Sequence, residues 1–90
     1  MAHLQVTCIT KRPSHYDPHE RIQALGGGGW YKAEETVIGE IERRTNSYFV
    51  RVGGRSVSVI VATHLGRKYL KTEADGYSPD NLLNLRDCQR

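Results

Sequence analysis

Residues 47–63 read SYFVRVGGRSVSVIVAT, with apolar and polar side chains alternating on both sides of two glycines. Alternation of this kind is typical of strands that are buried on one face, and a two-residue glycine turn is typical of a tight β-hairpin. We therefore expect strands at 47–52 and 55–63. The turn predicts a register in which the facing residues are Val52 and Arg55, Val50 and Val57, and Tyr48 and Val59.

The two faces of this hairpin differ in chemistry. One face is apolar and is expected to lie in the core, with Tyr48, Val50, Val52, Val57, Val59 and Val61. The other face mixes polar and apolar side chains, with Phe49, Arg51, Ser56, Ser58, Ile60 and Ala62. An uncovered face of this composition can stack nucleic-acid bases or contact another protein.

Segments before and after the hairpin supply further elements. A reversal at 64–67 predicts a following strand at 68–72, and the alternation from Leu4 to Cys8 predicts a strand ending near Thr10. Asp17-Pro18 is typical of a helix start, and this short helix is expected to end at the glycine run 26–29. We interpret that run as a flexible connector between two helices.

A second helix is predicted from the spacing of Ala33, Val37 and Ile41. Glu34 and Glu35 are expected in its first turn, and Arg43 and Arg44 in its last turn, which suits the helix dipole. Gly39 is expected where the helix backbone packs closely against a sheet. Ser78-Pro79-Asp80-Asn81 again resembles a helix start and predicts a short helical turn near the C-terminal end.

These elements predict one small α+β domain over residues 1–90. We expect a mostly antiparallel β-meander sheet, two helices packed on one of its faces, and the short C-terminal helical turn.

Charge is distributed unevenly along the chain. Residues 43–71 hold no Asp or Glu and have a net charge of +7. Residues 1–42 and residues 72–90 each have a net charge of −2, so the net charge of the 90 residues is only +3. A concentration of positive charge favours anionic partners. The basic residues of this segment are Arg43, Arg44, Arg51, Arg55, Arg67, Lys68 and Lys71.

Other kinds of site find less support in the pattern. Cys8, His15, His19 and Cys88 lack the paired spacing of a structural zinc site, so we expect no metal and no other cofactor. The glycine run departs from the phosphate-loop pattern and is followed by Glu34 and Glu35, which would repel an anion. There is no nucleophile elbow, and Asp75 and Asp80 lie in a turn-rich loop. We therefore expect a protein that is not an enzyme and has no catalytic residues.

The location of the protein is predicted from what the chain lacks. No apolar stretch approaches the length of a membrane-spanning helix, and residues 1–6 do not resemble a signal peptide. Two cysteines do not form the disulfide framework of a small secreted protein. We expect a reduced, cytoplasmic protein in which Cys8 acts as a small core residue.

The C-terminal part carries a family resemblance. Residues 69–76, YLKTEADG, and residues 80–85, DNLLNL, resemble the signature of a small bacterial family known as domain of unknown function 3892. Ile9-Thr10, His19, Ile22, Leu25 and Ile41-Glu42 fit the same family, whereas the glycine run departs from it. The resemblance implies a stand-alone domain and no particular activity. Its motif residues are Tyr69, Leu70, Thr72, Asp75, Gly76, Asn81, Leu82 and Leu83.

Those motif residues also have a structural interpretation. Asp75-Gly76 is typical of a turn, and Asn81 can satisfy backbone groups near a helix start. A role in binding for Asp75, Asp80 and Asn81 is the alternative.

Two hypotheses for function follow. The seven basic residues and Phe49 predict a nucleic-acid-binding module, in which Arg51, Arg55, Lys68 and Lys71 contact phosphates and Phe49 stacks on a base. Alternatively, Phe49, Ile60 and Ala62 form the interface of a homodimer or of a complex with another protein.

Overall fold

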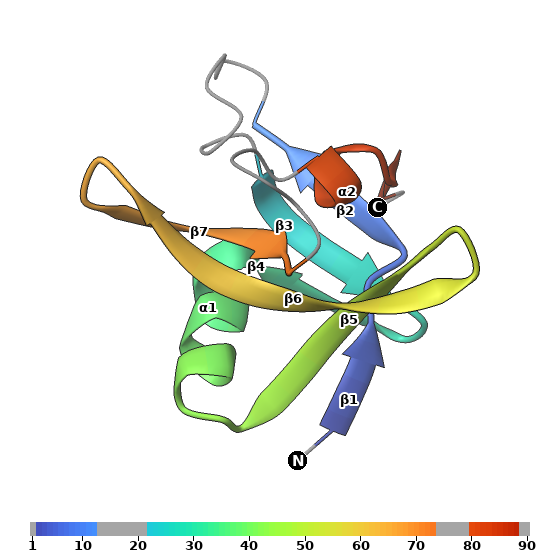
Figure 1. The fold of residues 1–90 in the computed structure, drawn as a ribbon, viewed down its shortest axis with the longest axis horizontal. Coiled ribbons are helices and arrows are strands. Elements are labelled where there is room, and N and C mark those ends of the chain that lie inside the picture. The colour runs from blue at the N-terminus through green and yellow to red at the C-terminus, as the bar shows by residue number, and fades with distance from the viewer. Residues whose placement is uncertain (1, 13–21, 74–79, 89–90) are drawn as a thin grey trace.

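A computed structural model describes residues 2–12, 22–73 and 80–88 (Figure 1). The strands in these residues form two four-stranded sheets and not the single meander sheet that we expected. The first sheet has the order β1-β5-β6-β7 and consists of β1 (Ala2–Gln5), β5 (Asn46–Val52), β6 (Arg55–His64) and β7 (Arg67–Thr72). The second has the order β4-β3-β2-β8 and consists of β4 (Trp30–Ala33), β3 (Ile22–Gly27), β2 (Cys8–Lys11) and β8 (Arg86–Asp87). The α+β class is confirmed, and the single sheet is wrong.

The N-terminal segment explains why there are two sheets. It was expected to form one strand, but it breaks at Val6 and Thr7 into β1 and β2. The Val6 amide donates to the carbonyl of Phe49 at 2.8 Å, and the Thr7 amide donates to the carbonyl of Gly26 at 2.9 Å. Two consecutive amides therefore bond to different sheets. β1 runs parallel to β5, and β8 runs parallel to β2, so both sheets are mixed.

The hairpin β5–β6 has the expected register, with Val52 facing Arg55 and Val50 facing Val57. Gly53 and Gly54 both have positive φ, 58° and 82°, as a tight hairpin turn requires. The apolar face is buried at its centre, at Tyr48, Val50 and Val59, but Val52 at the hairpin end is 38% exposed and does not belong to the core. Val57 and Val61 are half-buried and pack against the core.

The prediction of a helix before the glycine run is wrong for the residues that the structure describes, because Ile22–Gly27 forms strand β3. β3 pairs with β4 as a hairpin, so the glycine run does not connect two helices. Gly26 and Gly27 lie inside β3, where an added Cβ would come within 2.8 Å of the Cys8 sulfur and 2.3 Å of the Trp30 indole nitrogen respectively. The glycines thus allow close packing within a sheet. The expected helix start at Asp17-Pro18 lies outside the described residues.

Helix α1 (Glu34–Glu42) is confirmed, with Glu34 and Glu35 in its first turn. Its end differs from expectation, because Arg43 and Arg44 follow the last turn. Arg44 has a φ of 58°, and the amides of Arg44 and Thr45 donate to the carbonyls of Ile41 and Glu40, which is a Schellman motif.

The expectation that Gly39 packs against a sheet is wrong. The nearest atoms to a Cβ at this position belong to the Arg43 side chain, at 3.0 Å.

The short C-terminal helical turn is confirmed as α2 (Asp80–Leu83). No helix in the described residues is long and apolar enough to cross a membrane.

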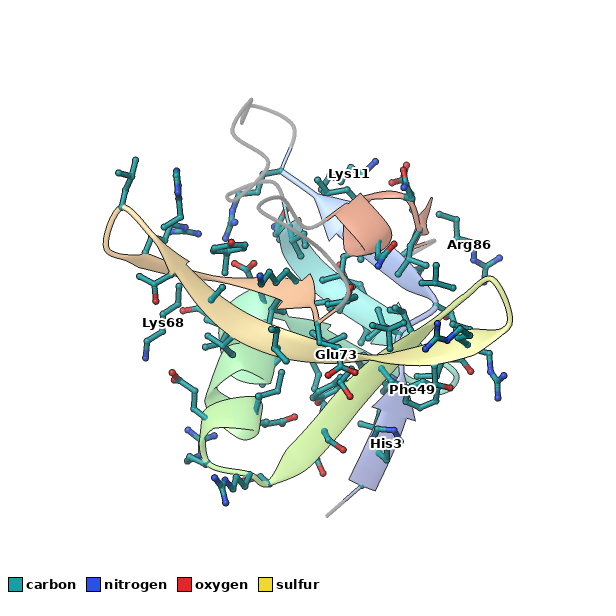
Figure 2. The ribbon with its side chains drawn as sticks, viewed as in Figure 1. His3, Lys11, Phe49, Lys68, Glu73 and Arg86 are labelled. Atoms are coloured by element: carbon teal, nitrogen blue, oxygen red, sulfur yellow. A yellow bond between two sulfur atoms is a disulfide. The ribbon has the colours of Figure 1, made fainter. Side chains whose placement is uncertain are left out.

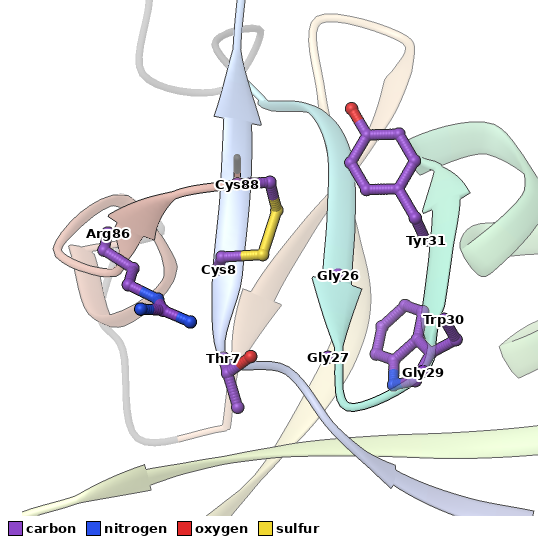
Figure 3. A pocket seen from close by; sticks show the side chains of 9 residues that line it. All are labelled: Thr7, Cys8, Gly26, Gly27, Gly29, Trp30, Tyr31, Arg86 and Cys88. Carbon is purple, nitrogen blue, oxygen red and sulfur yellow. A yellow bond between two sulfur atoms is a disulfide. The ribbon is translucent and has the colours of Figure 1, made fainter. Parts of the chain in front are cut away.

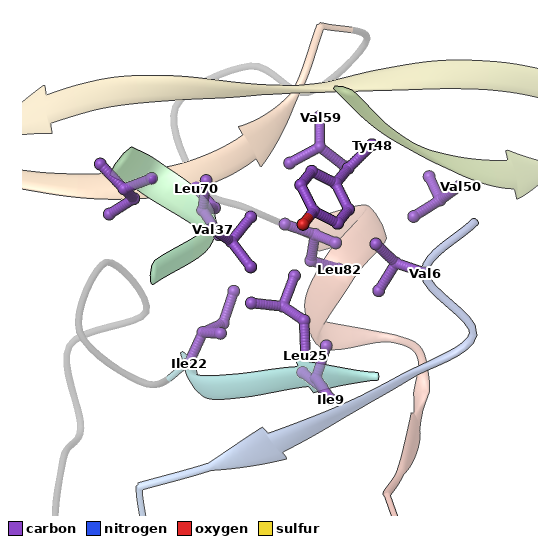
Figure 4. Close-up of a cluster of buried hydrophobic side chains, with 11 residues drawn as sticks. Val6, Ile9, Ile22, Leu25, Val37, Tyr48, Val50, Val59, Leu70 and Leu82 are labelled. Carbon is purple, nitrogen blue, oxygen red and sulfur yellow. The ribbon is translucent and has the colours of Figure 1, made fainter. Parts of the chain in front are cut away.

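The core lies between the two sheets, with α1 and α2 packing into it (Figure 4). It draws side chains from both sheets and both helices: Val6, Ile9, Ile22, Leu25, Val37, Ile38, Tyr48, Val50, Val59, Leu70 and Leu82.

A disulfide joins Cys8 in β2 to Cys88, which follows β8, so the expectation of two reduced cysteines is wrong. Neither cysteine is free to ligate a metal as a thiolate. Disulfides are typical of oxidising compartments, and the cytoplasmic location stays a prediction.

Candidate nucleic-acid interface

The seven basic residues of segment 43–71 occupy separate places in the fold. Arg43 and Arg44 follow α1, while the hairpins β5–β6 and β6–β7 turn at opposite ends of β6 (Figure 1). The structure therefore does not gather the seven on one surface. Arg51 and Arg55 flank the first turn, Arg67 and Lys68 follow the second, and Lys71 lies within β7.

Two of these cations are engaged with carboxylates of α1. The Lys68 ammonium lies 2.8 Å from Oε2 of Glu42, and the Arg67 guanidinium lies 3.8 Å from Oε1 of Glu34. Both pairs hold the β6–β7 hairpin against the helix. Because their charge is partly balanced, Arg67 and Lys68 are weaker candidates for phosphate contacts than the sequence indicated.

Phe49 has an aromatic neighbour that no pattern in the sequence indicated. The parallel pairing of β1 with β5 places the His3 ring against the Phe49 ring, with centroids 4.5 Å apart and planes 17° from parallel (Figure 2). Ser47 contacts Nδ1 of His3 through its hydroxyl at 2.6 Å. His3 is exposed and Phe49 is half-buried, so the stacked pair forms a platform on the outer face of the first sheet.

Cations and polar groups flank this platform. Arg51 and Arg55 are exposed and have no ion pair with any described residue. Arg51 shares the outer face with Phe49, whereas Arg55 pairs with Val52 at the turn and starts on the opposite face. Glu73 follows β7, and its carboxylate accepts from the amide of Ser58, the residue of β6 that pairs with Phe49, at 3.4 Å. A cavity of about 300 Å³ lies here, lined by Val52, Arg55, Ser56, Val57 and Glu73.

Ile60 and Ala62 share the outer face with Phe49, and both are half-buried. The side chains proposed for a protein interface therefore do lie on one face of one sheet.

Most of the described family-motif residues have structural roles. Tyr69, Leu70, Thr72 and Leu82 are buried, and Leu83 packs against the core. The Asn81 amide donates to the Thr72 hydroxyl at 2.8 Å and so ties α2 to β7. This supports the structural interpretation. Asp75 and Gly76 lie outside the described residues, and nothing is described of the Asp80 side chain.

A polar network that sequence reasoning missed joins α1 to both sheets. The Lys32 ammonium donates to both oxygens of Glu40, at 3.0 and 3.1 Å, and to the Tyr48 hydroxyl at 3.1 Å. Tyr48 and Asn46 also donate to Glu40. The sequence carries no local spacing that points to this network, because Lys32, Glu40 and Tyr48 come from three different elements.

The pKa of each titratable group in the network is shifted in the direction that favours the protonation state in which its hydrogen bonds form. The hydrogen bond from Tyr48 lowers the pKa of Glu40, and the bonds to Tyr48 and Glu40 raise the pKa of Lys32. Burial, followed by the neighbouring Glu40, raises the pKa of Tyr48. With every member bonded, the network acts as a structural link rather than as a reactive group.

Gly26 and Gly27 of β3 border a second cavity, of about 560 Å³, beside the disulfide (Figure 3). Trp30 and Tyr31 line one side, and Arg86 lies opposite them, beyond Cys8 and Cys88. The Tyr31 hydroxyl is bonded to the Thr10 hydroxyl at 2.8 Å. Among the described residues no group of three or more His, Cys, Asp or Glu side chains is placed to hold a metal ion. His15 and His19 lie outside those residues.

One comparison with known proteins identifies a family. The family model described as protein of unknown function (DUF3892) matches residues 5–86, which is nearly the whole chain. The chain belongs to this family. Neither a curated protein nor a solved structure matches it. The fold and contacts described above are therefore those of a DUF3892 domain.

Proposed function

We propose that this DUF3892 domain is a non-enzymatic binding module and that it binds single-stranded nucleic acid on the outer face of the sheet β1-β5-β6-β7. The observation that supports it most is the His3–Phe49 stack on the outer face beside Arg51, with Arg55 at the adjacent turn. Neither arginine has an acidic partner among the described residues. Aromatic platforms combined with backbone-tracking cations are the usual means of binding single strands.

The proposal assigns a role to each group. Phe49 stacks with a base, and its contact with His3 keeps the ring in place. Arg51 and Arg55 contact phosphates, while Lys71 lies on the same face, on β7. Arg67 and Lys68 are secondary, since both already face carboxylates of α1.

The proposal that the domain is not an enzyme rests on how its acids are used. Of the described carboxylates of α1, Glu40 and Glu42 are engaged in contacts with the sheets, and Glu34 lies between two arginines.

A titration with short oligonucleotides tests the proposal. Amide NMR spectra are recorded with a single-stranded and a double-stranded 10-mer at two salt concentrations. We expect shifts at His3, Phe49 and Arg51 with the single strand, and an affinity that falls with salt in proportion to the phosphates contacted, with a slope of about −0.7 per contact. The absence of shifts on this face at low salt would overturn the proposal.

Matched variants sharpen the test. Removing two positive charges at Arg51 and Arg55 by substitution with Gln should weaken binding and reduce the salt slope by about one unit or more. The same change at Arg43 and Arg44, beyond the end of α1, should leave affinity nearly unaltered. Equal losses for both double variants would show that binding reflects net charge rather than this face.

The half-buried Ile60 and Ala62 favour a second candidate function, which is association through the same face. It predicts a sedimentation coefficient that rises with protein concentration and a monomer after Ile60→Lys. A monomer at all concentrations would exclude the homodimer.

A further inference from the structure

Glu34 is a buried acid at the start of α1. It is 3% exposed, and its Oε1 atom lies 3.8 Å from both the Arg12 and the Arg67 guanidinium. Arg12 follows β2 and Arg67 begins β7, so the carboxyl group lies where both sheets meet the helix. A guanidinium nitrogen of Arg12 also donates to the Ile22 carbonyl at 2.8 Å, which fixes its position.

The second carboxyl oxygen of Glu34 has no matching donor. Oε2 is inaccessible to solvent, and no described residue forms a hydrogen bond with it. Buried polar atoms are nearly always bonded, and an unmatched one calls for an explanation. Burial raises the pKa of Glu34 to about 7, against the lowering effect of the Arg12 and Arg67 charges and of the Leu70 backbone amide. Near neutral pH the group therefore exists in both protonation states.

A cavity of about 470 Å³ adjoins this group. Glu34 lines it together with Arg12, Glu35, Ile38, Gly66, Arg67 and Lys68. Three of these side chains are cations and two are acids, and Lys68 also faces Glu42. Glu35 is exposed, so its charge is the better screened of the two acids.

The chemistry of the lining restricts the ligand. Two arginines favour a ligand that presents several acceptor oxygens, as carboxylates and phosphates do. The open position on Glu34 requires a ligand that also donates a hydrogen bond when Glu34 is ionised. The sequence alone suggested that Glu34 repels anions, but burial and two flanking arginines reverse that expectation.

We propose that this cavity binds a protonated tetrahedral oxyanion of the phosphate class, with its P–OH group donating to Glu34 and its other oxygens accepting from Arg12 and Arg67. Phosphate fits because the inorganic ion keeps a P–OH group throughout the neutral range, and a monoester gains one with a pKa of about 6, so the ligand can donate to an ionised Glu34. Sulfate offers the same shape and acceptors but carries no proton at neutral pH. Rotation about the last torsion of Glu34, which has a broad energy well, turns Oε2 toward the ligand.

Selectivity between phosphate and sulfate is the test. Inorganic phosphate, methyl phosphate and sulfate are titrated separately at pH 8.5, where Glu34 is largely ionised and cannot itself donate to sulfate, and at constant ionic strength, with amide shifts of Glu34, Gly66 and Arg67 as the readout. We expect phosphate to bind at least ten-fold more tightly than sulfate. Stronger binding of methyl phosphate identifies a monoester ligand, and stronger binding of the inorganic ion identifies free phosphate. Equal affinity for phosphate and sulfate, or no shifts at these residues, would overturn the proposal.

A variant and a second readout test the role of the carboxyl group. Glu34→Gln supplies an amide that donates as well as accepts, so the preference for phosphate should disappear while sulfate binding improves. Glu35→Gln, at the exposed neighbour, should keep the preference. In the unaltered protein, calorimetry of methyl phosphate binding in buffers of different ionisation enthalpy should show proton uptake at pH 7.5, because the free monoester is mostly without its last proton at this pH. Unchanged selectivity in Glu34→Gln, or binding of methyl phosphate without proton uptake, would contradict the proposal.

Discussion

At the scale of single residues, Glu34 shows how burial sets the pH dependence of stability. Burial raises its pKa from 4.5 to about 7, so between these values the native protein binds more protons than the unfolded chain. The free energy of unfolding should then fall as pH rises through this interval, by up to ~3 kcal/mol, and stay low above it.

We therefore expect Glu34→Gln to be more stable than the parent protein at pH 8 and to lose most of this dependence. Urea unfolding at pH 5 and pH 8 measures both effects. Glu35→Gln, at an exposed position, should keep the parental dependence. A parent protein whose stability rises from pH 5 to pH 8 would contradict the assignment.

Two glycines should respond oppositely to the same substitution. Gly39→Ala places a Cβ 3.0 Å from the mobile end of Arg43, which can move away, so the gain in helix propensity should raise the free energy of unfolding by ~0.5–1 kcal/mol. Gly26→Ala places a Cβ 2.8 Å from the Cys8 sulfur and 3.0 Å from that of Cys88, both fixed by the disulfide, and should lower it by ~1–3 kcal/mol. Chemical denaturation compares the two. A stabilised Gly26→Ala would show that β3 can shift.

At the scale of elements, the β6–β7 turn holds an unfavourable residue. Leu65 has a φ of 53° and is 90% exposed, and Gly66 follows with a φ of 79°. Asn tolerates this left-handed conformation better than Leu, so Leu65→Asn should raise the free energy of unfolding by ~0.5–1 kcal/mol. Thr63→Asn, on the exposed side of β6, serves as the control and should give no gain. Thermal or urea unfolding provides the measurement, and a loss of stability in Leu65→Asn would refute the turn assignment.

Elements fixed by local pattern were predicted well, and those fixed by distant partners were not. The hairpin at Gly53 and Gly54, and helix α1, depend on neighbours within a few residues, so alternation and spacing revealed them. The break at Val6 depends on β5 and β3, which lie far away in the sequence. β3 itself follows helix-start residues, and its pairing with β2 and β4 is what shows that Ile22–Gly27 is extended.

The residues of the candidate site were likewise predictable from the sequence, whereas the contacts made by distant partners were not. Phe49 and the basic residues were visible in the sequence, because residue type alone identifies aromatic platforms and cations. The His3 ring reaches Phe49 because His3 pairs with Ser47, which is 44 residues away in the sequence, and no local pattern encodes this pairing. The environment of Glu34 likewise requires Arg12 and Arg67 from two sheets.

At the scale of the whole molecule, the disulfide closes nearly the entire chain, joining residues that are 80 positions apart. In the chain-entropy description, a loop of this length contributes ~4 kcal/mol to stability. We therefore expect the melting temperature to fall markedly on reduction and in the double variant Cys8→Ser with Cys88→Ser. Calorimetry with and without a phosphine reductant measures the change, and a control without reductant accounts for handling. An unchanged melting temperature would mean that the bond adds nothing to the fold.

The break at Val6 and Thr7 also determines how the molecule opens. Because neighbouring amides are bonded to Phe49 in one sheet and Gly26 in the other, neither sheet can separate without pulling on the other through a single peptide unit. The two sheets then form one cooperative unit rather than two that unfold in turn. Native-state hydrogen exchange should accordingly give the central amides of β3 and β6 the same opening free energy, equal to that of global unfolding.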